Sequence, residues 1–381
     1  GSAAELDGVS GISRNERGAL MEETAWEAGK QQIQTSLAGA MALGLERGGF
    51  YRGGAPGSLN LLLHYEDGCR ANCGYCGLAR NRRIDEESRT FIRVRWPLYP
   101  VKRILEKLQL QGKTADFRHR HLKGLQRICV SMVTHPRAAA DTLQLVKELH
   151  ASSDLPCSVL LTPTTLPAGK DYLQQLHDAG VDCVGVAVDA ATPEIFQRWR
   201  GAGVAGPHRW QRYWDMLQDA TEVFADGLVS VHLIVGLGET EEEMVRTMRQ
   251  VRRTGAQIHL FSFCPEDGSG MEAMQPPPLG QYRRMQVAAY LANRDKLSWD
   301  KLTYSPCGKV TSFGAGLPEL LGENWAQGVP FMTGGCPGSD GCTTACNRPY
   351  GNEKPGQVLC NYPFKPQGED LASMEAQIWH E

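Results

Sequence analysis

Three cysteines near the start of the chain carry the side chains best suited to metal and redox chemistry. They stand in the run Cys69-Arg-Ala-Asn-Cys73-Gly-Tyr-Cys76, at spacing C-x3-C-x2-C, soon after the apolar run 59–63. Three neighbouring thiolates can hold three irons of a four-iron four-sulfur (4Fe-4S) cluster, because thiolate is the usual ligand of such clusters. No fourth cysteine is adjacent in the sequence, so one iron would stay open to another molecule.

A zinc knuckle or a group of disulfides is the alternative for this run. Zinc sites usually combine two hooks of the C-x2-C type or add histidine, and neither lies beside these cysteines. The chain has twelve cysteines and no visible secretory signal. Because thiols stay reduced in the cytoplasm, this count favours metal binding over disulfides. We therefore expect a cytoplasmic protein that binds metal through cysteine.

The composition narrows the classes of protein. A length of 381 residues accommodates one (β/α) barrel, which takes roughly 250 residues. Hydrophobic residues make up 41% and charged residues 22%, which is ordinary for a soluble globular chain. The net charge of -3 and the lack of a basic stripe with interleaved aromatics disfavour a nucleic-acid partner. No apolar run is long enough to span a membrane.

Apolar runs of strand length alternate with amphipathic helical segments along most of the chain. This alternation predicts a parallel sheet with helices outside it, curled into a complete or partial TIM-type (β/α) barrel. Residues 22–47 are rich in good helix formers and predict one or two helices. We expect an N-terminal helical lead-in over 1–50, the barrel over 51–310 and a cysteine-rich C-terminal extension over 311–381. Strands are expected at 59–63, 127–133, 156–161, 182–188, 228–235 and 258–263.

A second cysteine group lies in the C-terminal extension, among many glycines and prolines. Its members are Cys336, Cys342, Cys346 and Cys360, at spacing C-x5-C-x3-C-x13-C. Few apolar residues are present to build a core, so another force must hold the segment. An auxiliary iron–sulfur cluster would do so, a four-thiolate zinc site is the rival, and free thiols remain the third option. Cys307 could replace one of the four ligands.

The first cysteine run, at the junction of a strand and a loop, resembles the radical S-adenosylmethionine (SAM) superfamily. Most of residues 40–300 resembles its biotin-synthase-like group, above all in the run 232–239. The resemblance implies that the open iron of the 4Fe-4S cluster chelates SAM. Reductive cleavage of SAM would then give a 5′-deoxyadenosyl radical that abstracts hydrogen from a substrate. Tyr75 would pack over the cluster and its ligand. Active sites of such barrels lie at the C-terminal ends of the strands.

Other residues at strand ends extend the resemblance to SAM contacts. The run 232–239, with Ile234 and Glu239, resembles the family strand that packs on the adenine; an ordinary strand-to-helix turn is the alternative. Asp189 corresponds to an aspartate that binds the ribose hydroxyls, although an acid ahead of Pro193 would also favour a helix N-terminus. Arg209 aligns with the arginine that holds the methionine carboxylate, since a guanidinium matches a carboxylate. Ser131 occupies the position of the methionyl-amine motif.

Biotin synthase holds its sulfur-donating cluster inside the barrel on strand cysteines and an arginine. Cys129 and Cys157 match two of those positions, while Ser230 stands at the third and no arginine counterpart is evident. We therefore expect Cys129, Cys157 and Cys183 to be small buried hydrophobic residues on strands.

The C-terminal segment, with its Asn-Arg-Pro-Tyr and Asn-Tyr-Pro pieces, resembles the paired biotin-synthase-like lipoyl synthases. That resemblance implies insertion of sulfur from the auxiliary cluster into an unactivated C–H of an octanoylated carrier protein. It also implies a reductant such as ferredoxin or flavodoxin and a second radical SAM subunit. A small-molecule substrate remains open, as does a carbon-skeleton mutase or methyl transferase of the methylornithine-synthase type. The non-enzyme alternative is a metal-stabilised scaffold protein.

Overall fold

The fold is built around a single curved sheet. The computed structural model describes residues 26, 30–85, 89–111, 124–349 and 359–379. Within these ranges the main sheet has eight strands in the order β3-β1-β2-β4-β5-β6-β7-β8. Each neighbouring pair from β2 to β8 is parallel. These six parallel strands are β2 (Ser58–Leu63), β4 (Arg127–Ser131), β5 (Cys157–Leu161), β6 (Val181–Asp189), β7 (Val229–Val235) and β8 (Gln257–Ser262).

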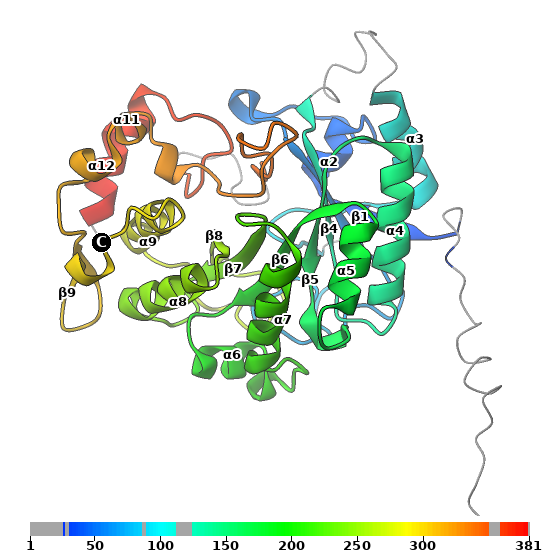
Figure 1. Cartoon of the computed structure of the whole chain (residues 1–381), viewed down its shortest axis with the longest axis horizontal. Helices are drawn as coiled ribbons and strands as arrows, with labels where there is room; N and C mark the ends of the chain where they lie inside the picture. Colours follow the sequence, from blue (N-terminus) through cyan, green and yellow to red (C-terminus); the bar gives the residue numbers. More distant parts are fainter. Residues whose placement is uncertain (1–25, 27–29, 86–88, 112–123, 350–358, 380–381) are drawn as a thin grey trace, which may run out of the picture.

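Helices cover the outer face of the parallel strands (Figure 1), as the alternating pattern predicts. In α8, Thr240 and Glu243 form a capping box, and the apolar face carrying Met244 and Met248 is buried. The sequence therefore starts this helix with satisfied backbone donors and fixes the side that packs. The helices are α3 (Val101–Gln111), α4 (Ala138–Ser152), α5 (Asp171–Asp178), α6 (Pro193–Trp199), α7 (Trp210–Val223), α8 (Glu241–Arg253) and α9 (Leu279–Ala292).

The N-terminal part differs from the expected helical lead-in. Of the segment 22–47, the described residues contain the strand β1 (Gln32–Thr35) before the short helix α2 (Leu37–Ala42). β1 pairs antiparallel with β2 on one side and with β3 (Leu98–Pro100) on the other. The helix prediction is wrong for β1, because pairing with two neighbours outweighs the local preference of a four-residue segment. Residues 1–25 and 27–29 lie outside the described ranges.

The sheet is a partial barrel. In the described chain its edge strands are β3 and β8, so the six parallel strands curl without closing on themselves. The prediction of an α/β fold with a parallel sheet is thus confirmed in its partial form. Within the same ranges, no helix combines the length and apolarity needed to cross a bilayer.

The C-terminal elements pack on the outside of this sheet. They comprise a hairpin of β9 (Thr303–Tyr304) and β10 (Val310–Ser312), then α10 (Leu317–Leu321), α11 (Glu323–Ala326) and α12 (Gly368–Trp379). Arg284 of α9 is 3% exposed; it binds Glu241 at 2.5 Å and donates to the Ile378 carbonyl of α12. One buried cation thereby joins three elements far apart in sequence.

Residues 334–348, which we call the closing segment, lie against the N-terminal ends of the strands. The Asn347 amide accepts from the Gly57 N–H and donates to the carbonyl of Ala55, both at 2.9 Å. Arg127, at the start of β4, donates through its Nε to the Pro337 carbonyl. Its two terminal guanidinium nitrogens bind the Asp182 carboxylate. The closing segment therefore covers the end of the barrel opposite the loops that follow the strands.

Candidate functional site

The first cysteine group lies on the loop that leaves the C-terminal end of β2. Cys73 is buried, and Cys69 and Cys76 are half-buried. The loop is tight: the Cys76 N–H donates to the Cys73 carbonyl at 3.1 Å, and the Ala79 N–H donates to the Cys76 carbonyl at 3.1 Å. Two successive turns thus present the cysteines in a compact arrangement.

Neighbouring elements fix this loop through Gly74. Its N–H donates to the Trp199 carbonyl and its carbonyl accepts from the Met271 N–H, both at 2.8 Å. A Cβ on Gly74 would lie 2.8 Å from the Trp199 ring, closer than any side chain tolerates. The glycine between Cys73 and Tyr75 is therefore required by the close approach of α6.

The three cysteines line one cavity of about 200 Å³. The cavity opens between this loop and the C-terminal ends of the parallel strands, where barrel active sites are built. Its wall contains apolar side chains from β5, β7, β8 and the residues just after β4, together with polar groups. The polar lining includes Tyr75, Thr162, Asp189, Arg200, His208, His232 and Cys264.

The donor set fits a multinuclear cluster better than a single ion. Burial raises the pKa of the Cys73 and Cys76 thiols, and a bound metal would offset this effect by favouring the thiolates. Across the described ranges, no three His, Cys, Asp or Glu side chains converge on one metal ion. In a cluster each thiolate binds a different iron, so the sulfurs need not meet at one point. The Leu78 N–H also donates to the Cys76 sulfur at 3.3 Å, a contact that tunes cluster potentials.

Asp189 lies at the end of β6 with a strained backbone. Its φ is 63°, a left-handed conformation that aspartate tolerates better than most residues. The Tyr75 hydroxyl donates to its carboxylate at 2.6 Å, and Arg200 lies 3.4 Å from the same oxygen. Strain of this kind is typical of functional positions. The three side chains form a polar cluster on the cavity wall beside Cys73.

The remaining predicted SAM contacts are placed in different ways. Ile234 lines the cavity, and Ser131 lies on the adjoining interior face of β4 without being part of the lining. Glu239 is buried and accepts the N–H groups of Gly236 and Leu237 at 2.6 and 2.9 Å. Burial raises the pKa of Glu239 to about 7. Its carboxyl group therefore holds the turn after β7.

Arg209 is the predicted contact of the methionine carboxylate. It is exposed at the N-cap of α7 and does not line the cavity. The arginines that line the cavity are Arg93 and Arg200. Arg200 is 5% exposed and donates to the Val188 carbonyl at 3.0 Å. Sequence reasoning missed Arg200 because it lies on the turn after α6, where no motif distinguishes one arginine from its neighbours.

Two histidines in the cavity wall are held neutral. Burial lowers the pKa of His208 to about 2, and its Nδ1 lies 2.6 Å from the Thr164 hydroxyl and 2.9 Å from the Tyr213 hydroxyl. Burial also lowers the pKa of His232 well below its ordinary value, with the charges of His259 and Arg348 acting in the same direction. These side chains can donate or accept hydrogen bonds but add no positive charge.

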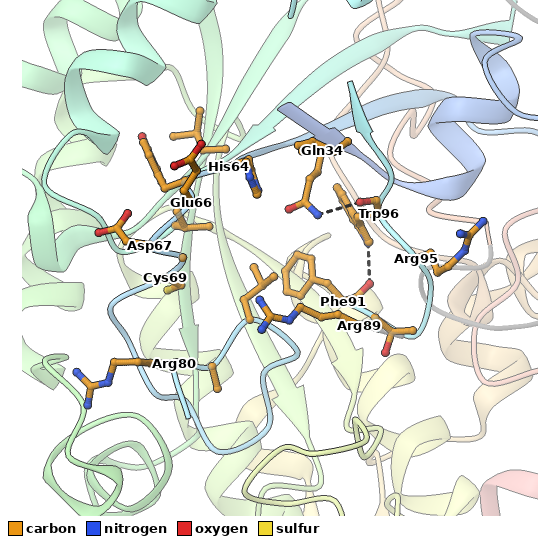
Figure 2. A pocket seen from close by; sticks show the side chains of 18 of the residues that line it. Gln34, His64, Glu66, Asp67, Cys69, Arg80, Arg89, Phe91, Arg95 and Trp96 are labelled. Atoms are coloured by element: carbon orange, nitrogen blue, oxygen red, sulfur yellow. Dashed lines mark hydrogen bonds between the residues drawn. The ribbon is translucent and has the colours of Figure 1, made fainter. Parts of the chain in front are cut away.

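A second hollow, a cleft of about 370 Å³, meets the cysteine loop from the side of β1. Figure 2 shows Cys69 on one wall of the cleft and Arg89 reaching toward it beneath Phe91. Trp96 closes the far wall: Gln34 donates to its carbonyl at 2.9 Å, and its indole donates to the Phe91 carbonyl at 2.6 Å. The cleft and the cavity share Cys69, Leu78, Phe91 and Val133. Cys69 is therefore reachable from two sides.

The second cysteine group divides in the structure. Cys336 and Cys346, on the closing segment, reach the barrel interior, where the Cys183 thiol donates to the Cys336 sulfur at 3.4 Å. Cys342 is exposed and Cys360 is half-buried. Cys342 nevertheless lines a cavity of about 530 Å³ together with Cys183 and Cys336.

The remaining cysteines fall into separate environments. Cys157 belongs to the apolar core, as expected of a small buried side chain. Cys307 is exposed beside the Ser305 hydroxyl. Cys264 follows β8 and lines the cavity of the first group. Because it is far in sequence from the first cysteine group, the sequence alone does not predict this position. Cys183 is buried, as expected, and Cys129 is half-buried. Both face the barrel interior, which only strand register could reveal.

Comparisons with known proteins bear on the middle of the chain. Residues 65–251 match the model of the Radical SAM superfamily. No curated protein gave a significant match.

Among solved structures, the FeFe-hydrogenase maturase HydG from Carboxydothermus hydrogenoformans is 14% identical, with a TM-score of 0.44 over 68% of this chain and 59% of that one. The radical SAM methyltransferase TsrM from Kitasatospora setae is 17% identical, with a TM-score of 0.38 over 58% of this chain and 37% of that one. The chain thus spans less than two thirds of either protein.

Proposed function

We propose, from the Radical SAM superfamily domain of residues 65–251, that this chain cleaves SAM reductively and inserts sulfur into an unactivated C–H bond. The first group, Cys69, Cys73 and Cys76, holds the 4Fe-4S cluster. The sulfur comes from an auxiliary iron–sulfur cluster that involves the closing segment. The substrate class is an octanoylated carrier protein, which makes the reaction that of a lipoyl synthase.

The observation that carries the proposal is that the strand β6 runs from the cavity of the first cysteine group to a second thiol group. β6 contributes Asp189 to the cavity at its C-terminal end and Cys183 near its N-terminal end. Cys183 in turn contacts Cys336. The same strand therefore carries a side chain of the cavity at one end and a member of the second thiol group near the other.

The cavity residues have roles that follow from their chemistry. Asp189 offers a carboxylate to vicinal hydroxyls such as those of a ribose, and Tyr75 and Arg200 hold it in place. Arg200 also brings a buried positive charge that suits a carboxylate ligand. Ile234 and Phe261 add apolar surface that excludes water from a reactive intermediate.

The bound groups supply the difficult chemistry, and the protein supplies binding and orientation. One electron from an external reductant would convert SAM into methionine and a radical that leaves as 5′-deoxyadenosine after taking the substrate hydrogen. An auxiliary cluster, which cysteines of the closing segment would help to hold, would supply the sulfide that joins the substrate carbon and would take up the electron released. Each insertion therefore consumes one SAM, one electron and one sulfide.

The cleft beside Cys69 suits the approach of the reductant, such as a ferredoxin or flavodoxin. Among the described residues that line it are Arg80, Arg89 and Arg95, with Glu66 and Asp67 as the acidic ones. A basic surplus at the rim favours an acidic electron carrier and speeds its association. A second radical SAM subunit, where two sulfurs are needed, is part of the same proposal.

The test is an anaerobic assay with SAM, reductant and an octanoyl-lysine peptide. We expect 5′-deoxyadenosine together with a thiol or lipoyl product, with the second radical SAM subunit added in a parallel reaction. Sulfur-free products such as a rearranged or methylated chain would contradict sulfur insertion. A protein that binds zinc and forms no 5′-deoxyadenosine would contradict radical chemistry altogether.

A further inference from the structure

Strand register places two cysteines and a serine in one row on the inner face of the sheet. Cys129 of β4 pairs with Ser158 of β5, and Ser158 pairs with Cys183 of β6. Directly paired residues on neighbouring strands point to the same face. Asn60 of β2 continues the row, because it pairs with Cys129. The inner wall at this level is therefore polar and contains two thiols.

The closing segment brings two more thiols to the same level. Both the Ala345 and the Cys346 N–H groups donate to the Cys336 carbonyl, at 3.0 and 3.4 Å. This pairing holds Cys336 and Cys346 side by side, although ten positions separate them in sequence. The Cys336 sulfur lies 3.4 Å from that of Cys183. The Cys346 sulfur lies 4.0 Å from the Asn60 carboxamide oxygen, next to Cys129 in the row.

The closing segment packs tightly against the strands at the positions that hold the two cysteines. Gly335 is so near Cys346 that a Cβ on it would lie 2.6 Å from the Cys346 Cβ. A Cβ on the preceding Gly334 would meet nothing within 4 Å. Gly57, just before β2, is equally tight, since its Cβ would lie 2.5 Å from the Ala345 carbonyl oxygen. Glycine at 57 and 335 lets the segment seat the two cysteines against the strands.

A buried arginine near the interior thiols has no negatively charged partner in the described ranges, so an anionic group bound there would be stabilised. Arg348 is 9% exposed, stacks on Phe261 at 3.9 Å and donates to the Gly334 carbonyl at 2.9 Å. Its Nε has no hydrogen-bond partner, and no carboxylate in the described ranges forms an ion pair with it. A buried cation without a counter-charge is costly. An iron–sulfur cluster held by four thiolates carries negative charge and would offset it.

We propose that Cys129, Cys183, Cys336 and Cys346 together ligate the auxiliary iron–sulfur cluster inside the barrel. Two ligands come from strands and two from the closing segment, and Arg348 lies beside the cluster as its counter-charge. This ligand set replaces Cys342 and Cys360 of the spacing-based hypothesis by Cys129 and Cys183. The role of the cluster as sulfur source rests on the proposed function, whereas the identity of its ligands does not.

The test is the iron and acid-labile sulfide content of anaerobically reconstituted full-length protein. We expect Cys129→Ala and Cys183→Ala each to lose about half of both, the share of one of two 4Fe-4S clusters. Cys342→Ala and Cys360→Ala are the matched controls and should keep the full content. Loss of iron from the Cys342 or Cys360 variants, with full retention in the Cys129 and Cys183 variants, would overturn the ligand set.

Two further measurements keep the outcome clear if a variant folds poorly. Cys183→Ser keeps an oxygen ligand, so we expect a shifted Mössbauer or electron paramagnetic resonance signal from the auxiliary cluster rather than its loss. The Cys69→Ala/Cys73→Ala/Cys76→Ala variant should show the auxiliary signal alone while it forms no 5′-deoxyadenosine. Zinc in place of iron in that triple variant, or a Cys183–Cys336 disulfide in the reconstituted protein, would also contradict the proposal. Sulfur-free turnover with an intact auxiliary signal would refute only sulfur donation.

Discussion

The two thiol groups of this protein are built in opposite ways. The first group takes its three cysteines from eight consecutive residues of one loop, and short turns of that loop set their arrangement. The interior group draws Cys129, Cys183, Cys336 and Cys346 from two strands and the closing segment. A site made by local chain geometry shows itself as a spacing motif, whereas a site made by topology does not.

The largest expected effect concerns the first cysteine group. Cys76→Ala should reduce 5′-deoxyadenosine formation to background, because the cluster would lose one of its protein ligands. Cys264→Ala is the matched control, since Cys264 lines the same cavity and should leave cleavage of SAM unchanged. Loss of both iron and 5′-deoxyadenosine from Cys264→Ala would show that the cluster has a fourth thiolate and no open iron.

The binding of SAM should depend on Asp189 and not on Arg209. Asp189→Asn keeps the shape and the left-handed backbone preference but removes the charge. A charge-assisted hydrogen bond contributes about 1.5–3 kcal/mol, so the Kd for SAM should rise about 10- to 100-fold. Isothermal titration of cluster-loaded protein gives this value. Arg209→Ala, at the exposed N-cap of α7, should bind SAM like the wild type; the reverse pattern would restore the sequence-based assignment.

The adjacent glycines Gly334 and Gly335 offer a test of the interior thiol group. Gly335→Ala should displace the chain at Cys346, because the new Cβ would meet the Cys346 backbone and side chain. We expect it to lower the iron content by up to about half and to leave the first cluster intact. Gly334→Ala has open space around its Cβ and should have no effect. Equal iron contents in the two variants would mean that the closing segment does not set the interior site.

These variants also show what the sequence could predict. The alternation of strands and helices and the spacing of Cys69, Cys73 and Cys76 are local patterns, so they were accessible. β1 was missed because its four residues owe their conformation to pairing with β2 and β3. The interior position of Cys183 depends on the register of three strands and on the path of a segment about 150 positions away, as its contact with Cys336 shows. Local patterns contain none of that information.

The stability of the turn after β7 should depend on pH through Glu239. Its pKa is raised by burial from 4.5 to about 7, so the folded state binds the proton more tightly than the unfolded state. The contribution of Glu239 to the free energy of unfolding is fully present below pH 4.5 and is lost as the pH rises through 7. The free energy of unfolding should change by about 3 kcal/mol over this range. Glu239→Gln should flatten this part of the profile in thermal melts from pH 4.5 to 7.5. An unchanged slope would contradict the assignment.

The smallest effect concerns the cleft of Figure 2. Arg89→Ala should slow reduction by an acidic carrier about two- to tenfold at low ionic strength, and added salt should narrow the difference. The side chain lies in the cleft beside Cys69 and not in the SAM cavity. Reduction by dithionite, a small reagent that needs no docking surface, should be unaffected. A deficit that persists with dithionite would mean that Arg89 supports the cluster loop instead.

The most direct test pairs one variant of each thiol group and measures 5′-deoxyadenosine and iron in the same samples. Replacing Cys69, Cys73 and Cys76 by alanine should abolish 5′-deoxyadenosine and retain about half of the iron. Replacing Cys129 and Cys183 by alanine should retain 5′-deoxyadenosine formation, lose the other half of the iron and give no sulfur-containing product. Two results would contradict two separate sites in one barrel. In one, both variants lose 5′-deoxyadenosine formation and the same amount of iron; in the other, neither variant changes in iron content or in 5′-deoxyadenosine formation.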